Sequence, residues 1–71
     1  MMNEEQLAPL LGKKCEVFVD MKQHKPFRYE GKVLDVSKDF FTILDFKTRK
    51  RMTCHNDDII SIVQGGLLNE S

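Results

Sequence analysis

The chain lacks several features that mark specialised small proteins. It has no net charge, because 11 lysine and arginine residues balance 11 aspartate and glutamate residues. A neutral chain lacks the long-range attraction to phosphate that drives non-specific nucleic-acid binding, so any such binding must come from local patches. The apolar runs are only a few residues long, which argues against a membrane-spanning helix.

Cysteine and histidine are also scarce. Cys15 and Cys54 have no disulfide-framework spacing, which favours buried thiols in a reducing compartment. The two histidines and two cysteines show no finger or ribbon spacing, so neither a metal nor a cofactor is expected. The acidic pair Glu4 and Glu5 stands where a signal peptide would be basic and apolar. These features predict a cytoplasmic protein.

Catalytic motifs are missing as well. The chain has no P-loop, no GxSxG and no convincing nucleophile–base pair. Its 71 residues make one domain at most, with little room for a substrate pocket. We therefore predict that it is not an enzyme, and that so small a domain forms oligomers.

The apolar pattern predicts a short helix followed by five strands. A capping box from Asn3 to Gln6 starts a helix over about residues 4–11, which Pro9 interrupts or restarts and Gly12 ends. Alternation then predicts strands at 15–20, 27–36, 40–46, 51–55 and 59–63, so that the sheet occupies about 14–64 and a flexible tail occupies 65–71. A glycine inside the longest strand, Gly31, predicts a sharp bend there.

This order of elements resembles the Sm-like superfamily, which includes the Sm and LSm ring proteins and bacterial Hfq. Tyr29-Glu30-Gly31 and the apolar positions after it resemble the first Sm motif, and Asn56-Asp57-Asp58 with the aliphatic run 59–63 resembles the second. The resemblance covers roughly residues 7–63. It implies a small, strongly bent, five-stranded antiparallel SH3-like barrel of the Sm type, whose fourth and fifth strands pair between copies to close a ring.

The chain departs from the family at its RNA-contacting positions. Ser37 stands at the family's aspartate, Phe41 at its base-contacting asparagine, and His55-Asn56 at its arginine–glycine pair. Two functions therefore remain open. One is a homo-oligomeric ring that binds single-stranded RNA in a chaperone or scaffold role, and the other is an SH3-like protein-interaction module that oligomerises without binding nucleic acid.

The candidate RNA-binding residues fall into two groups. Phe41 offers a stacking face and His55 and Asn56 offer hydrogen bonds at the inner rim of a ring, with Lys38 in the turn nearby. The alternative for Phe41 is a packed core residue, and for His55 a surface residue at a strand end. The second group is a basic run, Lys47, Arg49, Lys50 and Arg51. In a ring this run would be repeated around one face and could bind RNA. The alternative is that it forms a solvated hairpin tip whose charges oppose aggregation.

Overall fold

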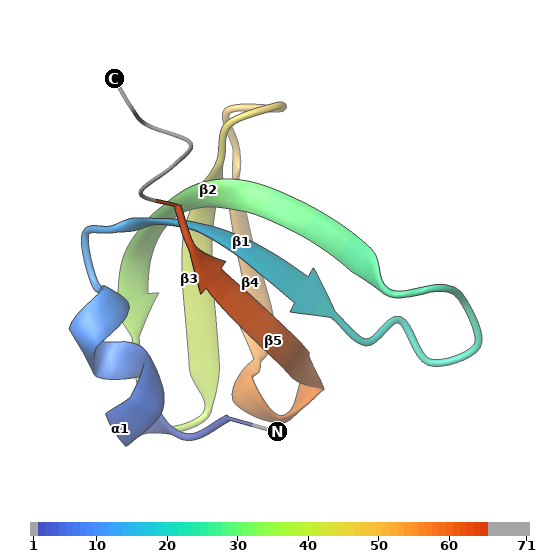
Figure 1. The fold of residues 1–71 in the computed structure, drawn as a ribbon, viewed down its shortest axis with the longest axis horizontal. Coiled ribbons are helices and arrows are strands. Elements are labelled where there is room, and N and C mark those ends of the chain that lie inside the picture. The colour runs from blue at the N-terminus through green and yellow to red at the C-terminus, as the bar shows by residue number, and fades with distance from the viewer. Residues whose placement is uncertain (1, 66–71) are drawn as a thin grey trace.

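A computed structural model describes residues 2–65 and shows a mainly β fold (Figure 1). A short helix, α1 (Glu4–Leu7), continues into a 3-10 turn, η1 (Ala8–Leu10). The strands that follow are β1 (Lys14–Val19), β2 (Phe27–Val36), β3 (Phe40–Asp45), β4 (Arg51–His55) and β5 (Ile59–Gln64), with a second 3-10 turn, η2 (Asn56–Asp58), between the last two. All pairings are antiparallel, in the order β4-β3-β2-β1-β5. The predicted fold class, a small β-barrel-like fold, is confirmed.

The N-terminal helix forms as its sequence indicates. The side chain of Asn3 accepts a hydrogen bond from the backbone N–H of Gln6, and the Gln6 side chain accepts one from the backbone N–H of Asn3. The α-helix ends at Leu7 rather than near residue 11, and Pro9 sits in the 3-10 turn that replaces its last part. Gly12 then takes a φ of 81°, a left-handed conformation that suits glycine.

Strand β2 arches over the molecule and brings two neighbours close together (Figure 1). Gly31 pairs with Cys15 on one side and Asp45 on the other. A Cβ atom at Gly31 would lie 2.1 Å from the carbonyl oxygen of Leu44, so a side chain there would force the strands apart. The register between β2 and β3 also shifts between Val33 and Asp35, a bulge that adds to the bend and was not predicted.

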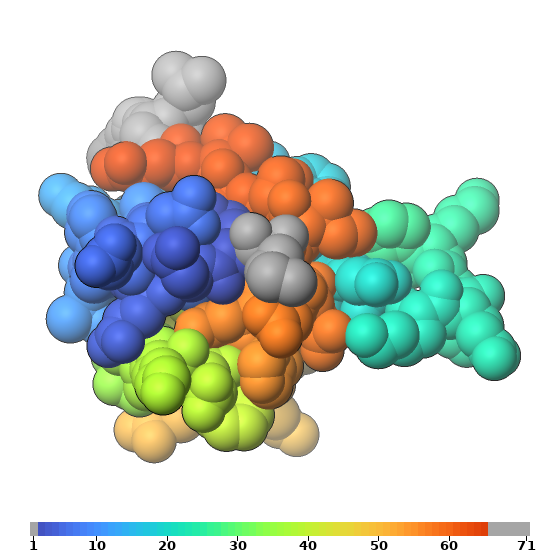
Figure 2. Space-filling model, turned by 90° about the horizontal axis from the view of Figure 1, so that it is seen from below, coloured from blue at the N-terminus to red at the C-terminus, as the bar shows by residue number. Residues whose placement is uncertain are grey.

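The core lies inside the curled sheet, and α1 packs against it through Leu7. Alternate residues of β1 and of β3 point inward, as the period of a strand requires. Seen from below in Figure 2, the N-terminal helix covers this end of the barrel, beside the β2–β3 and β4–β5 turns. The buried apolar residues are Leu7, Cys15, Val17, Val19, Val33, Phe41, Ile43 and Ile59.

The sheet has two borders without a strand partner among the described residues, β4 and β5. Strand β3 ends at Asp45, one residue earlier than predicted, and β5 extends to Gln64. Gly65, which we placed in the tail, is buried and its N–H donates to the Lys14 carbonyl at 2.6 Å. The rest of the predicted tail, 66–71, lies outside the described residues.

Candidate nucleic-acid interface

Two turns far apart in the sequence are joined at one end of the barrel, which we call the turn end. It consists of the β2–β3 turn, 37–39, and η2, together with the flanking residues Phe40 and His55. The backbone N–H of Asn56 donates to the Asp39 carbonyl at 2.8 Å. Its side-chain Nδ2 donates to the carbonyls of Ser37 at 3.0 Å and Lys38 at 2.9 Å. These three bonds fix the position of one turn against the other.

Ser37 also shapes its own turn. Its backbone N–H donates to the Phe40 carbonyl at 2.9 Å, and its hydroxyl lies 3.2 Å from both the N–H and the carbonyl of Phe40. Serine favours such local bonds to the backbone, which is why the turn forms here. Between the two turns lies an open pocket of about 210 Å³, lined by Met2, Asn3, Lys38, Asp39, His55, Asn56 and Asp57.

His55 is held at the edge of this pocket. Its Nδ1 accepts a hydrogen bond from the backbone N–H of Asp57 at 3.1 Å, so the neutral ring carries its proton on Nε2. The ring also meets Phe40 edge-on, with centroids 5.4 Å apart. The imidazole is therefore positioned from two sides, and its Nε2–H is a donor that the Nδ1 bond leaves free.

The stacking residue that we predicted is not available on the surface. Phe41 has no exposed side-chain area and packs in the core, so the packed alternative describes it. Its neighbour Phe40 is 52% exposed and contacts His55. Successive residues on a strand face opposite sides, so only one of the two phenylalanines can face outward. Sequence reasoning missed Phe40 because it carried the family's asparagine position onto Phe41.

Asn56 is likewise not free to contact a base. It is 2% exposed, and both carbonyls facing its Nδ2 lie in the β2–β3 turn. Its Oδ1 is buried and has no hydrogen-bond partner among the described residues. Asn56 therefore holds the two turns together. The accessible groups of the predicted rim are Lys38 and His55.

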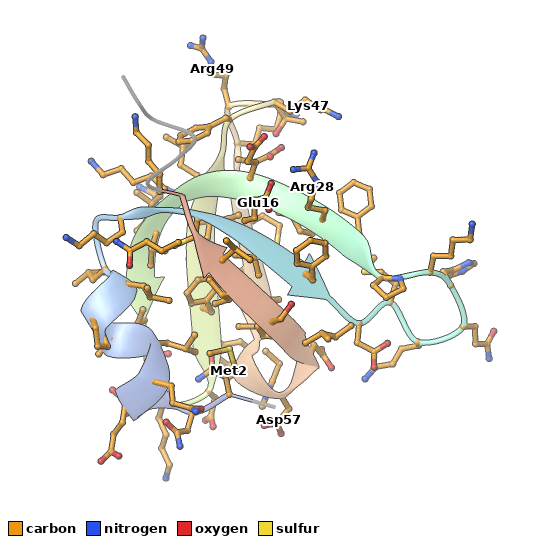
Figure 3. All side chains as sticks on the ribbon, viewed as in Figure 1. Met2, Glu16, Arg28, Lys47, Arg49 and Asp57 are labelled. Atoms are coloured by element: carbon orange, nitrogen blue, oxygen red, sulfur yellow. The ribbon has the colours of Figure 1, made fainter. Side chains whose placement is uncertain are left out.

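The basic run lies at the opposite end of the barrel, which we call the hairpin end. Lys47 and Arg49 are at the top of Figure 3, whereas Met2 and Asp57 are at the bottom. The turn is local, because Asp45 accepts bonds from the Thr48 N–H at 3.2 Å and hydroxyl at 2.8 Å. The Thr48 hydroxyl bond is the main reason that the pKa of Asp45 is lowered. The structure thus separates the two groups of candidates.

The charges at the turn end are mixed. Lys38 is exposed and has no ion pair within residues 2–65. Two carboxylates, those of Asp39 and Asp57, line the same pocket. Carboxylates accept hydrogen bonds from base amino groups and repel phosphates. The pocket therefore offers two carboxylates as hydrogen-bond acceptors and one lysine ammonium as a donor.

The thiols show no sign of reactivity. Cys15 is buried, and burial raises its pKa. Burial also raises the pKa of Cys54 to about 11, so the thiolate is scarce at neutral pH. No group of three or more metal-ligating side chains is found within residues 2–65.

Three comparisons with known proteins found no relative of this chain. No family model, no curated protein and no solved structure matches this chain. Within the part of the chain that the structure describes, no helix has the length and apolar character needed to cross a membrane. The fold and the site geometry are therefore the grounds for assigning a function.

Proposed function

We propose that copies of this chain assemble through β4 and β5 into a closed ring, and that the ring binds single-stranded RNA at the turn end. The observation that carries the proposal is the strand order, which leaves β4 at one border of the sheet and β5 at the other. Joining β5 of one copy to β4 of the next is a head-to-tail contact. Such contacts form closed rings when the rotation between copies is suitable.

The composition of β5 supports this assembly. Ile60 is 49% exposed and Val63 is 53% exposed, although both belong to a border strand. Exposed, apolar border strands promote pairing with other chains, and natural monomers usually avoid them. A neighbouring β4 would pair with this backbone and cover these side chains.

The turn end supplies the contacts for RNA. Phe40 presents a ring for stacking, His55 offers its Nε2–H, and Lys38 offers a charge. Stacking on an aromatic ring contributes about 1–3 kcal/mol per base and tolerates any base. A ring would repeat this set once per copy, so a neutral chain would still present several contacts to one strand. Such a ring suits an RNA chaperone or scaffold.

The assembly is tested by light scattering on the purified protein. The expected mass is a multiple of the 8.3 kDa chain, and a strict monomer at high concentration contradicts the ring. The double variant Ile60→Lys and Val63→Lys should reduce the mass while leaving circular dichroism unchanged. Leu11→Lys is the matched control, because Leu11 is also 53% exposed but lies outside β5.

RNA binding is tested by fluorescence anisotropy with labelled oligouridine and oligoadenosine at two salt concentrations. Phe40→Ala should weaken binding by ~5- to 150-fold, the equivalent of one lost stack. Phe27→Ala is the matched control, because Phe27 is 49% exposed and lies outside the turn end. An oligomer that binds neither oligonucleotide at low salt contradicts the RNA role and favours the alternative, a protein-interaction module.

A further inference from the structure

The pocket at the turn end carries two carboxylates against one ammonium. Asp39 and Asp57 line it, both are exposed, and neither pairs with a lysine or arginine within residues 2–65. Lys38 and the Nε2–H of His55 are its donors beside these carboxylates. An ionised aspartate accepts through two oxygens and donates nothing. Most of the unmet hydrogen-bonding capacity of the aspartates is therefore for N–H groups of a ligand.

Asn56 adds an unsatisfied acceptor to the same pocket. It lines the pocket, its Nδ2 is used by the β2–β3 turn, and its Oδ1 is buried with no partner within residues 2–65. A buried acceptor without a donor is costly, so a further acceptor placed beside it would be unfavourable. The pocket therefore favours a ligand edge on which N–H groups lie side by side.

The exposed ring of Phe40 lies close to these groups. The His55 ring contacts Phe40, with centroids 5.4 Å apart, and its Nδ1 lies 3.8 Å from a carboxylate oxygen of Asp57. One histidine thus lies between an aromatic face and a carboxylate. A base that stacks on Phe40 would turn its hydrogen-bonding edge toward Asp57.

We propose that the turn end selects guanine, a specificity that rests on the proposed RNA role of this end. Guanine presents N1–H and the exocyclic N2 amino group side by side, and these match the two oxygens of one carboxylate. Its O6 lies next to N1–H and accepts from Lys38 or from the Nε2–H of His55. The mixed charges of the pocket thus match a base edge that carries two donors and one acceptor.

The other three bases match this arrangement less well. Uracil has one donor, N3–H, between two carbonyl groups, so a carboxylate that accepts from N3–H also faces O2 and O4. Adenine and cytosine each carry one amino group beside a ring nitrogen that is itself an acceptor. Two acceptors that face each other lose water without gaining a hydrogen bond, which lowers affinity. We expect the order guanine, then adenine and cytosine, then uracil.

The probes are a labelled nonauridine and four versions of it, in which the central nucleotide is guanosine, inosine, adenosine or cytidine. Fluorescence anisotropy with the full chain compares all five at one salt concentration. The guanosine probe should bind about 5- to 150-fold more tightly than nonauridine, the range for one bidentate pair. Inosine lacks only the N2 amino group of guanosine, so most of this gain should be lost. A guanosine probe that binds no better than the uridine or the inosine probe overturns the inference.

Carboxylate variants identify the contact. Asp57→Asn keeps the shape of the side chain but removes its charge and one acceptor, so the ratio of guanosine to uridine affinity should fall by about fivefold or more. The double variant Asp39→Asn and Asp57→Asn should abolish the preference. Glu4→Gln with Glu5→Gln is the matched control, because it makes the same change of charge at exposed residues that do not line the pocket. A preference that survives in the double variant, or that the control also removes, overturns the assignment to this pocket.

Guanine selection and the proposed function fail separately. An oligomer that binds none of the five probes at low salt contradicts the RNA role, and guanine selection fails with it. Binding of all five probes with equal affinity, or a preference for uridine, leaves the RNA role intact and overturns guanine selection alone. Phe40→Ala should lower the affinity of all five probes by a similar factor, whereas Asp57→Asn should change their ratio, so stacking and edge recognition are measured apart. Circular dichroism verifies that each variant is folded.

Discussion

The two ends of this barrel are built in different ways. At the turn end, Asn56 bonds to carbonyls 17 to 19 positions earlier in the chain, so distant segments are held together. At the hairpin end, Asp45 bonds to residues three to five positions later, and one backbone bond, from the Phe46 N–H to the Glu30 carbonyl, joins the hairpin to β2. Cross-linked segments keep a fixed geometry, whereas a local turn can move as a unit. The turn end therefore holds side chains from several elements in a more fixed arrangement than the hairpin end does.

The two ends of the barrel also differ in the charged side chains that they carry. The hairpin end carries three exposed cations in four residues of its turn, with no ion pair within residues 2–65. The turn end mixes a lysine, a histidine and two carboxylates around one pocket. A mixed set can select among ligands through hydrogen bonds, whereas exposed cations attract any anion. This difference supports the proposal that RNA bases bind at the turn end.

The largest expected loss of stability comes from truncating the core residue beneath the turn end. Phe41 is fully buried at the start of β3, so Phe41→Ala should lower the free energy of unfolding by ~3–5 kcal/mol. Urea unfolding followed by circular dichroism measures the change. Phe40→Ala is the neighbouring control, and a surface change of this kind should stay within about 0.5 kcal/mol. Similar losses from the two variants would show that Phe41 is not the packed member of the pair.

The second prediction compares the bonds that hold each end. Asn56→Ala removes two part-buried hydrogen bonds of a buried side chain and should cost about 1–3 kcal/mol, whereas Thr48→Ala at the hairpin end should cost about 0.5–1.5 kcal/mol. Asn56→Asp should cost more than Asn56→Ala, because a carboxylate would face two carbonyl oxygens. Thermal unfolding of the three variants measures the order. Equal losses of stability from Asn56→Ala and Thr48→Ala would contradict the view that the turn end is held more firmly than the hairpin end.

The substitutions at Asn56 and Thr48 should also differ in their effect on RNA affinity. Asn56 is buried and holds the two turns together, so under the proposed RNA role Asn56→Ala should lower RNA affinity in variants that remain folded. Thr48→Ala should leave RNA affinity unchanged. The anisotropy titration described above measures both, and an equal effect from Thr48→Ala would place the RNA at the hairpin end.

Much of the fold could be predicted from the sequence, because each strand has an alternating pattern and each turn has its own polar residues. The separation of the candidate site into two ends also follows from topology, since antiparallel strands place successive turns at alternate ends. The inward position of Phe41 could not be read from two adjacent phenylalanines, because either register buries one of them. The bulge near Leu34 and the bonds of Asn56 depend on contacts between distant segments, which no local pattern contains.

Lowering the pH should slightly reduce the stability of the protein through one carboxylate at each end, and by unequal amounts. The hydroxyl of Thr48 lowers the pKa of Asp45, and the hydrogen bond from Lys22 lowers the pKa of Asp58. A carboxyl group with a lowered folded pKa stabilises the fold above its usual pKa, and that contribution is lost as the pH falls below about 4. Melting temperatures measured from pH 6 to pH 2 should fall less steeply in Thr48→Ala and Lys22→Ala than in the natural chain. The Lys22→Ala difference should be the smaller, and should vanish in high salt, because the side chain of Lys22 is 69% exposed. Unchanged slopes in both variants would show that neither carboxylate contributes to stability.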